Sequence, residues 1–208
     1  MTNKSADTSY PIHEFLRERW SPRAFADRPV STEQLVTVLE AARWAPSAFN
    51  EQPWSFIVVM RDDQAAFEQV LSCLKEGNVV WAQHAPVLMI AVAKLAFDHN
   101  GKPNRHAFHD VGQSIAHLTF QAAAEGLVLH QMAGFSPDKA REVFTIPETH
   151  EPATALAVGH IGEADALPDA LREREMAERS RNPLASFVFT EGWDVPSPYI
   201  SNNATTSS

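Results

Sequence analysis

The strongest structural signal in the chain is a helical pattern over residues 108–125. Four apolar residues recur there at spacings of four, three and four, which places them on one face of a helix: Val111, Ile115, Leu118 and Ala122. Gly126 follows directly, and glycine readily adopts the left-handed conformation that ends many helices. Residues 127–132 then predict a strand. The chain therefore combines helices and strands.

Further elements are predicted on both sides of this helix. Apolar runs over residues 54–60, 86–92 and 153–161 predict three more strands. Ser31 and Gln34 have the spacing of a capping box, which predicts a helix over residues 32–45. The remaining predicted helices cover residues 11–19, a segment from Asp63 to about residue 74, a short stretch that begins at Ser136-Pro137, and residues 165–178.

Because these elements do not alternate strictly as β-α-β-α, the pattern favours an α+β fold over a doubly wound parallel sheet. A length of 208 residues with 44% hydrophobic residues suits a single domain with a full core. No repeat or linker divides the chain, so we predict one domain over residues 11–200. The polar residues 1–10 and 201–208 are expected to be disordered tails, and residues 187–189 a last strand or an arm.

Composition excludes several classes of function. The net charge is −9, and no long run of Lys or Arg offsets it, which argues against a nucleic-acid partner. Cys73 is the only cysteine, so an internal disulfide cannot form and a reducing compartment is expected. Because the N-terminus is polar, no secretory signal is expected there, and the longest apolar run is too short to span a bilayer. We therefore expect a cytoplasmic protein without a membrane partner.

Two basic segments stand out in this acidic chain. Near the start, Arg19-Trp20-Ser21-Pro22-Arg23 places two guanidinium groups and a hydroxyl on a turn that Pro22 keeps from continuing as helix. Far along the chain, Arg179 and Arg181 follow another predicted helix. Guanidinium groups suit phosphate oxygens, so the two segments predict one phosphate site if the fold brings them together.

With the turn Pro46-Ser47-Ala48-Phe49-Asn50-Glu51-Gln52-Pro53-Trp54 between them, these segments resemble the nitroreductase family of FMN-dependent oxidoreductases. The resemblance extends from about Ile12 to Phe189. It implies a mixed, largely antiparallel central sheet wrapped by helices. It also implies an intertwined homodimer with FMN in each of two clefts at the interface.

The resemblance assigns the basic residues to the cofactor. Arg19 and Ser21 match the family residues that bind the FMN phosphate, and Arg179 and Arg181 match a C-terminal basic pair that completes this site. Arg23 matches a cation beside N1 and O2 of the flavin, where it favours the reduced cofactor. Trp20 departs from the Arg or His that is common at its position.

The resemblance also assigns the residues around the flavin ring. Pro46, Ser47 and Ala48 match a segment that reaches the flavin from the partner subunit, although Ala48 replaces a small polar residue. Asn50 and Asn78 match ring contacts, and for Asn50 a turn satisfied by its own amides is an equal alternative. Met132, Ala133 and Gly134 match a segment whose backbone N–H groups lie near flavin N5 and O4, where Gly134 permits close approach.

Other kinds of site are weaker. His106, His109 and Asp110, with His99, could bind a metal, but nine histidines make such spacings common, so no metal is expected. The chain lacks GxSxG, GxxxxGK and GxGxxG motifs, which disfavours serine hydrolases, P-loop enzymes and Rossmann dehydrogenases. Cys73 is expected to be a buried structural thiol.

The resulting prediction is an FMN-dependent oxidoreductase that works by ping-pong hydride transfer. NAD(P)H reduces the flavin, and a small acceptor such as a nitroaromatic, quinone or enone then reoxidises it. No side chain is assigned as a catalytic acid or base, because the flavin carries the chemistry. Three alternatives stay open: a reductive dehalogenase, a flavin destructase and a non-catalytic flavin-binding protein.

Overall fold

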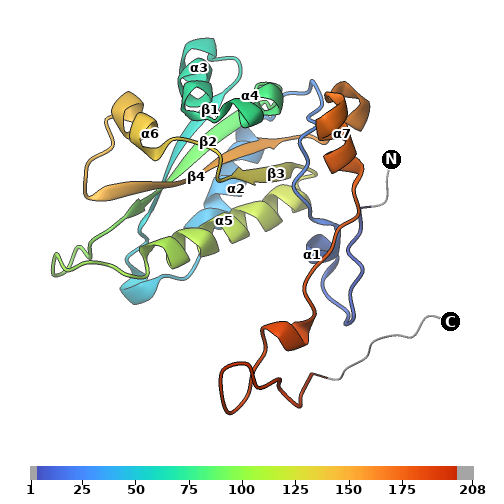
Figure 1. Ribbon diagram of the computed structural model, residues 1–208. Coiled ribbons are helices and arrows are strands. Elements are labelled where there is room, and N and C mark those ends of the chain that lie inside the picture. Colours follow the sequence, from blue (N-terminus) through green and yellow to red (C-terminus); the bar gives the residue numbers. More distant parts are fainter. Residues whose placement is uncertain (1–3, 201–208) are drawn as a thin grey trace.

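A four-stranded antiparallel sheet forms the centre of the computed structural model, which describes residues 4–200 (Figure 1). The strand order is β1-β2-β4-β3. The strands are β1 (Trp54–Met60), β2 (Val87–Lys94), β3 (Val128–Met132) and β4 (His150–Gly159). The α-helices are α1 (Glu14–Glu18), α2 (Thr32–Arg43), α3 (Gln64–Cys73), α4 (Glu76–Ala82), α5 (Ala107–Ala124), α6 (Pro137–Phe144) and α7 (Asp169–Met176).

Helices cover both faces of the sheet, and the central strand β2 separates two apolar clusters. Leu88, Ile90 and Val92 belong to the cluster that contains residues of α3, α4 and α6. Met89 and Ala91 point the other way, into the cluster that contains residues of α2 and α5. Successive side chains of a strand point to opposite faces, so a strand buried on both sides must be apolar throughout, as residues 87–93 are.

The predicted α+β class and most predicted elements are confirmed. Ser31 and Gln34 form both bonds of the capping box at the start of α2. The long helix is α5, and Gly126 follows it with a φ of +70°. All strand pairs within residues 4–200 are antiparallel, so the expected mixed character of the sheet is wrong for the described part of the chain.

The structure differs locally from the predicted elements at three places. The helix expected over residues 165–178 is divided into the short 3₁₀ turn η2 (Ala164–Ala166) and α7, because Pro168 lacks an N–H and restricts the residue before it. Helix α4 was not predicted; it is only seven residues long and contains Gly77 and Asn78, which are poor helix formers. Within the segment predicted as a turn before β1, residues Ala48–Asn50 form the short 3₁₀ helix η1.

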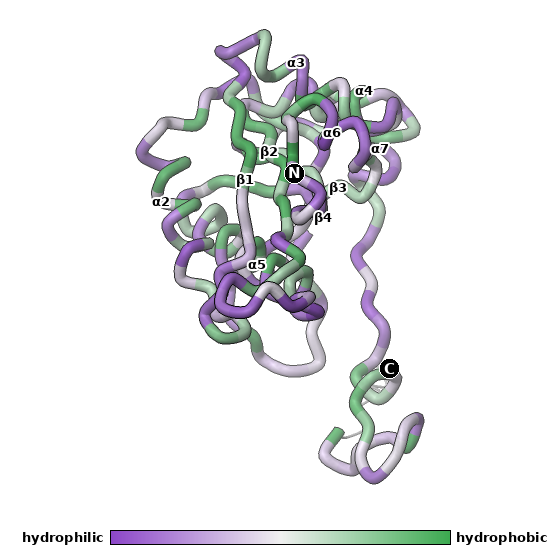
Figure 2. Tube along the Cα trace, turned by 90° about the vertical axis from the view of Figure 1, so that its left-hand side faces the viewer, coloured by the Kyte–Doolittle hydropathy of each residue, from purple (hydrophilic) through white to green (hydrophobic). Residues whose placement is uncertain are grey.

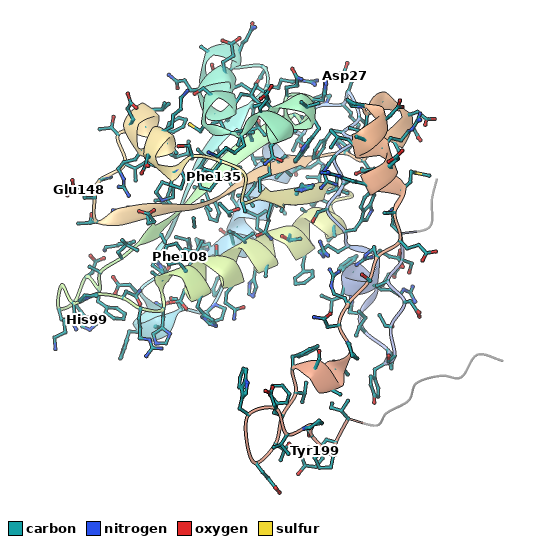
Figure 3. All side chains as sticks on the ribbon, in the orientation of Figure 1. Asp27, His99, Phe108, Phe135, Glu148 and Tyr199 are labelled. Atoms are coloured by element: carbon teal, nitrogen blue, oxygen red, sulfur yellow. The ribbon has the colours of Figure 1, made fainter. Side chains whose placement is uncertain are left out.

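Residues after α7 form an arm that extends away from the body of the molecule (Figures 1 and 2). Residues 187–189 belong to this arm and do not form a strand. They follow the 3₁₀ turn η3 (Leu184–Ser186), and Phe189 forms only an isolated bridge to Pro196 within the described residues. Trp193 and Tyr199 are 85% and 84% exposed. Figure 3 shows Tyr199 near the outer end of the arm. An arm with such large apolar side chains is suited to contact another surface.

The ends of the chain are only partly covered by the structure. Residues 4–10 contain no helix or strand, yet the Ala6 N–H donates to the Arg17 carbonyl at 2.9 Å. Residues 1–3 and the predicted tail 201–208 lie outside the described residues, so the disorder of both ends stays a prediction. Within residues 4–200, no helix has the length and apolar character needed to cross a membrane.

The end of β4 fixes the loop that precedes α2, and this contact requires a glycine. The Gly162 N–H donates to the Ala24 carbonyl at 2.9 Å, and the Ala26 N–H donates to the His160 carbonyl at 3.0 Å. A Cβ on Gly162 would lie 2.5 Å from the Phe25 carbonyl carbon, closer than such atoms approach.

We therefore expect Gly162→Ala to lower the free energy of unfolding by about 1–3 kcal/mol, the usual cost of overpacking. Urea unfolding followed by circular dichroism measures this change. Gly77→Ala is the control, because nothing lies within 4 Å of its added Cβ. If both variants are equally stable, the close approach at Gly162 is not a constraint.

Candidate functional site

The two basic segments meet at one pocket. Arg19 and Ser21, which follow α1, face Arg179 and Arg181, which follow α7. The pocket has a volume of about 230 Å³. Its lining is rich in cations and comprises Lys4, Arg19, Trp20, Ser21, Arg23, Arg174, Ala177, Glu178, Arg179 and Arg181. The fold therefore brings together groups that are about 160 residues apart in the sequence.

A buried carboxylate shapes the loop that carries the first basic segment. Glu175 of α7 has a side chain only 3% exposed. Its oxygens accept the N–H of Arg23 at 2.9 and 3.1 Å and the N–H of Ala24 at 3.1 Å. The Arg23 guanidinium lies 3.9 Å away and balances the charge. A buried carboxylate needs such partners, so the turn of the loop and the position of α7 depend on each other.

A histidine of β3 holds the same loop from the other side. His130 Nδ1 lies 2.9 Å from the Pro22 carbonyl, and its ring lies 4.5 Å from the Trp81 ring, centroid to centroid. Burial, with a smaller contribution from the Arg23 charge, lowers the pKa of His130 to about 4. The imidazole is therefore neutral at pH 7, and the proton on Nδ1 is the one donated to Pro22.

The pocket concentrates the positive charges of Arg19, Arg179 and Arg181. Burial and the nearby charges of Arg179 and Arg181 lower the pKa of Arg19. Burial and Arg181 likewise lower the pKa of Arg179. Within residues 4–200, no carboxylate lies within ion-pair distance of Arg19 or Arg181. Arg19 Nη1 donates to the Ser21 hydroxyl at 3.4 Å. Such a cluster favours a bound anion.

The turn at residues 46–52 lies far from this pocket within one chain. The Ala48 N–H donates at 3.0 Å to the buried Asp110 carboxylate, near the start of α5. The opposite end of α5 lies beside Arg19 and Trp20 in a neighbouring groove. From Asp110 to Ala123 the helix spans about 20 Å at 1.5 Å per residue. Figure 3 shows His99 and Phe108 at the same far end.

This turn is held in an unusual backbone conformation. Phe49, Asn50 and Gln52 have φ values of 54°, 54° and 51°, which cost about 1 kcal/mol or more for a residue such as Phe. The Ser47 hydroxyl accepts the Gln52 N–H at 3.0 Å, and the Gln52 side chain donates to the Asn50 carbonyl at 3.0 Å. Pro46 and Asn50 are exposed, so this edge is open to a contact.

A third group of predicted residues surrounds the end of β3. Asn78 of α4 donates from Nδ2 to the Gly134 carbonyl at 3.0 Å, and a Cβ on Gly134 would lie 2.6 Å from the same Nδ2. Met132 is buried, and its carbonyl accepts the Thr154 hydroxyl at 3.1 Å. Ala133 is exposed. Asn78 therefore fixes the 133–134 loop, and a Cβ at residue 134 would displace its amide group.

Strand β3 connects the cation pocket to this loop. Val128, at the start of the strand, lines the groove beside Arg19. Met132, the last residue of the strand, is followed by Ala133. At roughly 3.4 Å per residue the strand covers about 14 Å between them. A pocket rich in guanidinium groups at one end and a glycine-containing loop at the other suit a molecule with a phosphate group and an extended body.

The sequence analysis did not assign the roles of three residues of the site: Glu175 and His130, which it did not name, and Asp110, which it considered only as part of a metal site. Each binds a backbone group 62 or more residues away, namely N–H groups of Arg23 and Ala24, the Pro22 carbonyl and the Ala48 N–H. The only sequence signals were a Glu within a charged helix, a His within a strand and an Asp on the apolar helix. None of these identifies a partner without the fold.

The alternative sites have structural explanations. His109 Nδ1 lies 3.0 Å from Asp110, while the His106 and His109 rings are 6.5 Å apart. Among the described residues, no three His, Cys, Asp or Glu side chains converge as a metal site would require. Cys73 is buried, and burial raises the pKa of its thiol, which fits a structural role.

Comparisons with known proteins agree on one family. The sequence model of the nitroreductase family matches residues 16–160. A crystal structure of an oxidoreductase containing FMN is 34% identical, with a TM-score of 0.86 over 93% of this chain and 98% of that chain. A nitroreductase family protein from Clostridium difficile 630 is 26% identical, with a TM-score of 0.67 over 86% of this chain and 97% of that chain.

Two curated proteins are also similar. An uncharacterized 15.4 kDa protein of Mycolicibacterium smegmatis is 33% identical over 130 residues, which are 62% of this chain and 86% of that protein. Iodotyrosine deiodinase 1 of Sus scrofa is 27% identical over 79% of this chain and 66% of its own length, so the chain spans just under two thirds of the deiodinase. With the family match covering well over half of its residues, the chain belongs to the nitroreductase family.

Proposed function

We propose that the protein is an FMN-dependent oxidoreductase that transfers hydride from NAD(P)H to a small acceptor. The observation that carries this proposal is the cation cluster formed by the partly buried Arg19 and Arg179 with the exposed Arg181, in which neither Arg19 nor Arg181 has a carboxylate at ion-pair distance within residues 4–200. A phosphate dianion is the natural ligand of such a cluster. The FMN content of the similar oxidoreductase supports the same cofactor.

The described residues fit FMN along its length. Arg19, Ser21 and Arg181 would bind the phosphate, and Trp20 forms part of the same wall. Arg23 would lie at the N1 and O2 edge of the ring. Gly134, with Met132 and Ala133 before it, would offer backbone groups to the N5 and O4 edge, where the absence of a side chain allows close approach.

When bound, FMN supplies the ability to accept a hydride and pass it on. The protein supplies position and charge. Glu175 and His130 hold the 19–24 loop, so Arg19 and Ser21 would keep their arrangement toward the phosphate. The Arg23 guanidinium would add positive charge where negative charge develops during reduction. Asn78 holds the 133–134 loop, whose backbone groups would face the ring. No side-chain acid or base is required.

A homodimer would complete the site. Within one chain, the 46–50 turn lies about 20 Å from the cation pocket along α5, by the rise per residue of a helix. Ser47 of the partner subunit could reach the flavin only across an interface. The exposed apolar side chains of the arm, with Phe15 and Leu16 of α1, offer surface for such an interface. We therefore propose that each FMN lies between two subunits.

The proposed function leaves several chemical classes of electron acceptor to distinguish. Nitroaromatics, quinones and enones all accept hydride from reduced flavin. The similarity to iodotyrosine deiodinase favours reductive dehalogenation as a second candidate. A flavin destructase or a non-catalytic flavin-binding protein would share the same pocket but would not turn over NAD(P)H with an acceptor.

Removal of a pocket guanidinium should weaken FMN binding. We expect Arg19→Ala and Arg181→Ala each to raise the Kd for FMN roughly 10- to 100-fold, the range of a lost charge-assisted hydrogen bond. Quenching of FMN fluorescence by the apoprotein measures this Kd. Arg172→Ala is the matched control, since Arg172 of α7 pairs instead with Asp165 and Asp169. Unchanged affinity in both pocket variants would contradict the assignment.

The half-reactions distinguish the candidate activities. Under anaerobic conditions, NADH or NADPH should bleach the flavin absorption band at about 450 nm, and a nitroaromatic or quinone should restore it. A flavin that restores its colour only with iodotyrosine, releasing iodide, would favour the dehalogenase. A flavin that neither donor reduces would contradict the proposed NAD(P)H oxidoreductase.

A further inference from the structure

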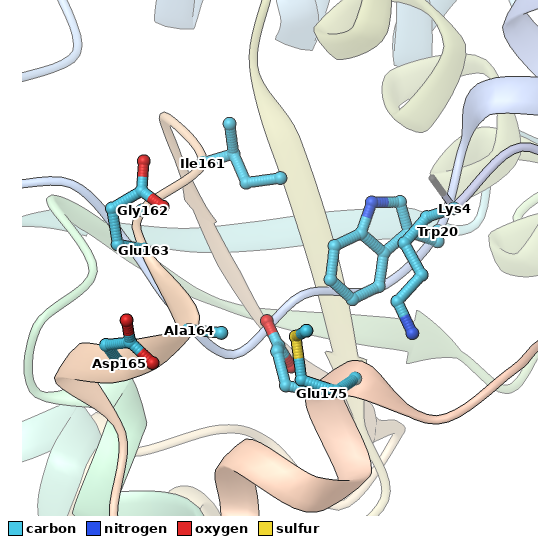
Figure 4. Close-up of a pocket in the computed structure, with 9 residues that line it drawn as sticks. Lys4, Trp20, Ile161, Gly162, Glu163, Ala164, Asp165 and Glu175 are labelled. Atoms are coloured by element: carbon cyan, nitrogen blue, oxygen red, sulfur yellow. The ribbon is translucent and has the colours of Figure 1, made fainter. Parts of the chain in front are cut away.

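The first described residues cross the rim of the cation pocket. Lys4 lines this pocket together with Arg19 and Arg181, although it belongs to a third segment of the chain. Its Nζ donates to the Ala177 carbonyl and lies 5.2 Å from the centroid of the Trp20 ring. Figure 4 shows Lys4 beside Trp20 at the edge of an adjoining hollow. Lys4 therefore adds a cation to the phosphate end of the site.

The segment is attached to the body at each of residues 4–6. The Ala6 N–H donates to the Arg17 carbonyl at 2.9 Å, and the Ser5 hydroxyl donates to Glu18 at 2.7 Å. The Lys4 carbonyl accepts a hydrogen bond from Arg179 Nη1. These contacts place the lysine stem along the indole ring and leave its ammonium at the pocket.

Arg179 differs from the other arginines of the pocket. Its Nη1 donates both to the Lys4 carbonyl and to the Arg17 carbonyl, the latter at 2.9 Å. One guanidinium nitrogen thus connects the N-terminal segment, α1 and the segment after α7. By contrast, Arg181 Nη1 donates to its neighbouring Ser180 carbonyl. The hydrogen bonds of Arg179 therefore act as a brace: they fix the backbone at Lys4 and Arg17.

We propose that residues 4–6 form a strap over the phosphate end of the cofactor pocket. Lys4 contributes its ammonium to the phosphate, and Arg179 acts as a positioning residue that holds the strap. The flexible four-carbon stem lets the ammonium move from the Ala177 carbonyl to a phosphate oxygen while it stays over Trp20. This inference rests on the proposed function, because it requires a phosphate-bearing cofactor in this pocket.

The test compares FMN with riboflavin, which has the same ring but lacks the phosphate. With the full-length apoprotein, Lys4→Gln should raise the Kd for FMN about tenfold, as expected for one charge-assisted contact, and leave the Kd for riboflavin unchanged. Lys4→Arg should keep most of the affinity for FMN. Lys102→Gln is the control, because it removes the same charge from an exposed loop at the other end of α5.

Two results would overturn the strap. An unchanged Kd for FMN in Lys4→Gln would show that the ammonium does not reach the phosphate. Equal weakening of FMN and riboflavin would show that the segment acts through the fold and not through the phosphate. Failure of the wild-type apoprotein to bind FMN would instead overturn the proposed function, so the two failures are distinguishable.

A double-mutant cycle tests the role of Arg179. If Arg179 works by holding the strap, Lys4→Gln should have little further effect on the Kd for FMN in an Arg179→Ala background. Limited proteolysis should also cut Arg179→Ala faster than wild type within residues 4–10. Effects on Kd that simply multiply, with unchanged proteolysis, would contradict the brace and assign Arg179 an independent contact.

Discussion

The bond between the Glu175 carboxylate and the backbone of Arg23 and Ala24 is the contact on which the site depends. It joins α7 to the loop after α1, two segments 152 residues apart. A carboxylate that is 3% exposed is costly to bury without partners, so α7 and the loop hold each other in place. Arg19 and Arg181 face one pocket because this contact exists. The cation cluster is therefore a product of packing.

Much of the fold follows from local patterns. The capping box of Ser31 and Gln34, the helix before Gly126 and the apolar strand β2 are all present, because each is specified by residues close together in sequence. The short helix α4 and the division at Pro168 were not predicted, since a seven-residue helix depends on tertiary contacts more than on propensity. The antiparallel order of the sheet is likewise a long-range property.

The site was predicted unevenly for the same reason. Arg19, Ser21 and Arg181 have a recognisable chemistry, and the fold places them together as the two basic segments suggested. Glu175, His130 and Asp110 bind backbone groups, which any sequence possesses, so the sequence does not reveal these roles. Arg179 shows the converse: its residue type predicts a phosphate ligand, while its hydrogen bonds to two carbonyls indicate a brace.

The pocket is built from residues 4–23 and 174–181, with the whole sheet between them in sequence. During synthesis, the first basic segment leaves the ribosome long before α7 exists. Until then Arg23 and Ala24 lack their carboxylate, and nothing fixes the loop that carries Arg19 and Ser21. Under the proposed function, FMN would therefore bind only after α7 has been made and has packed against this loop. Flavin occupancy would then be a measure of whether α7 has docked.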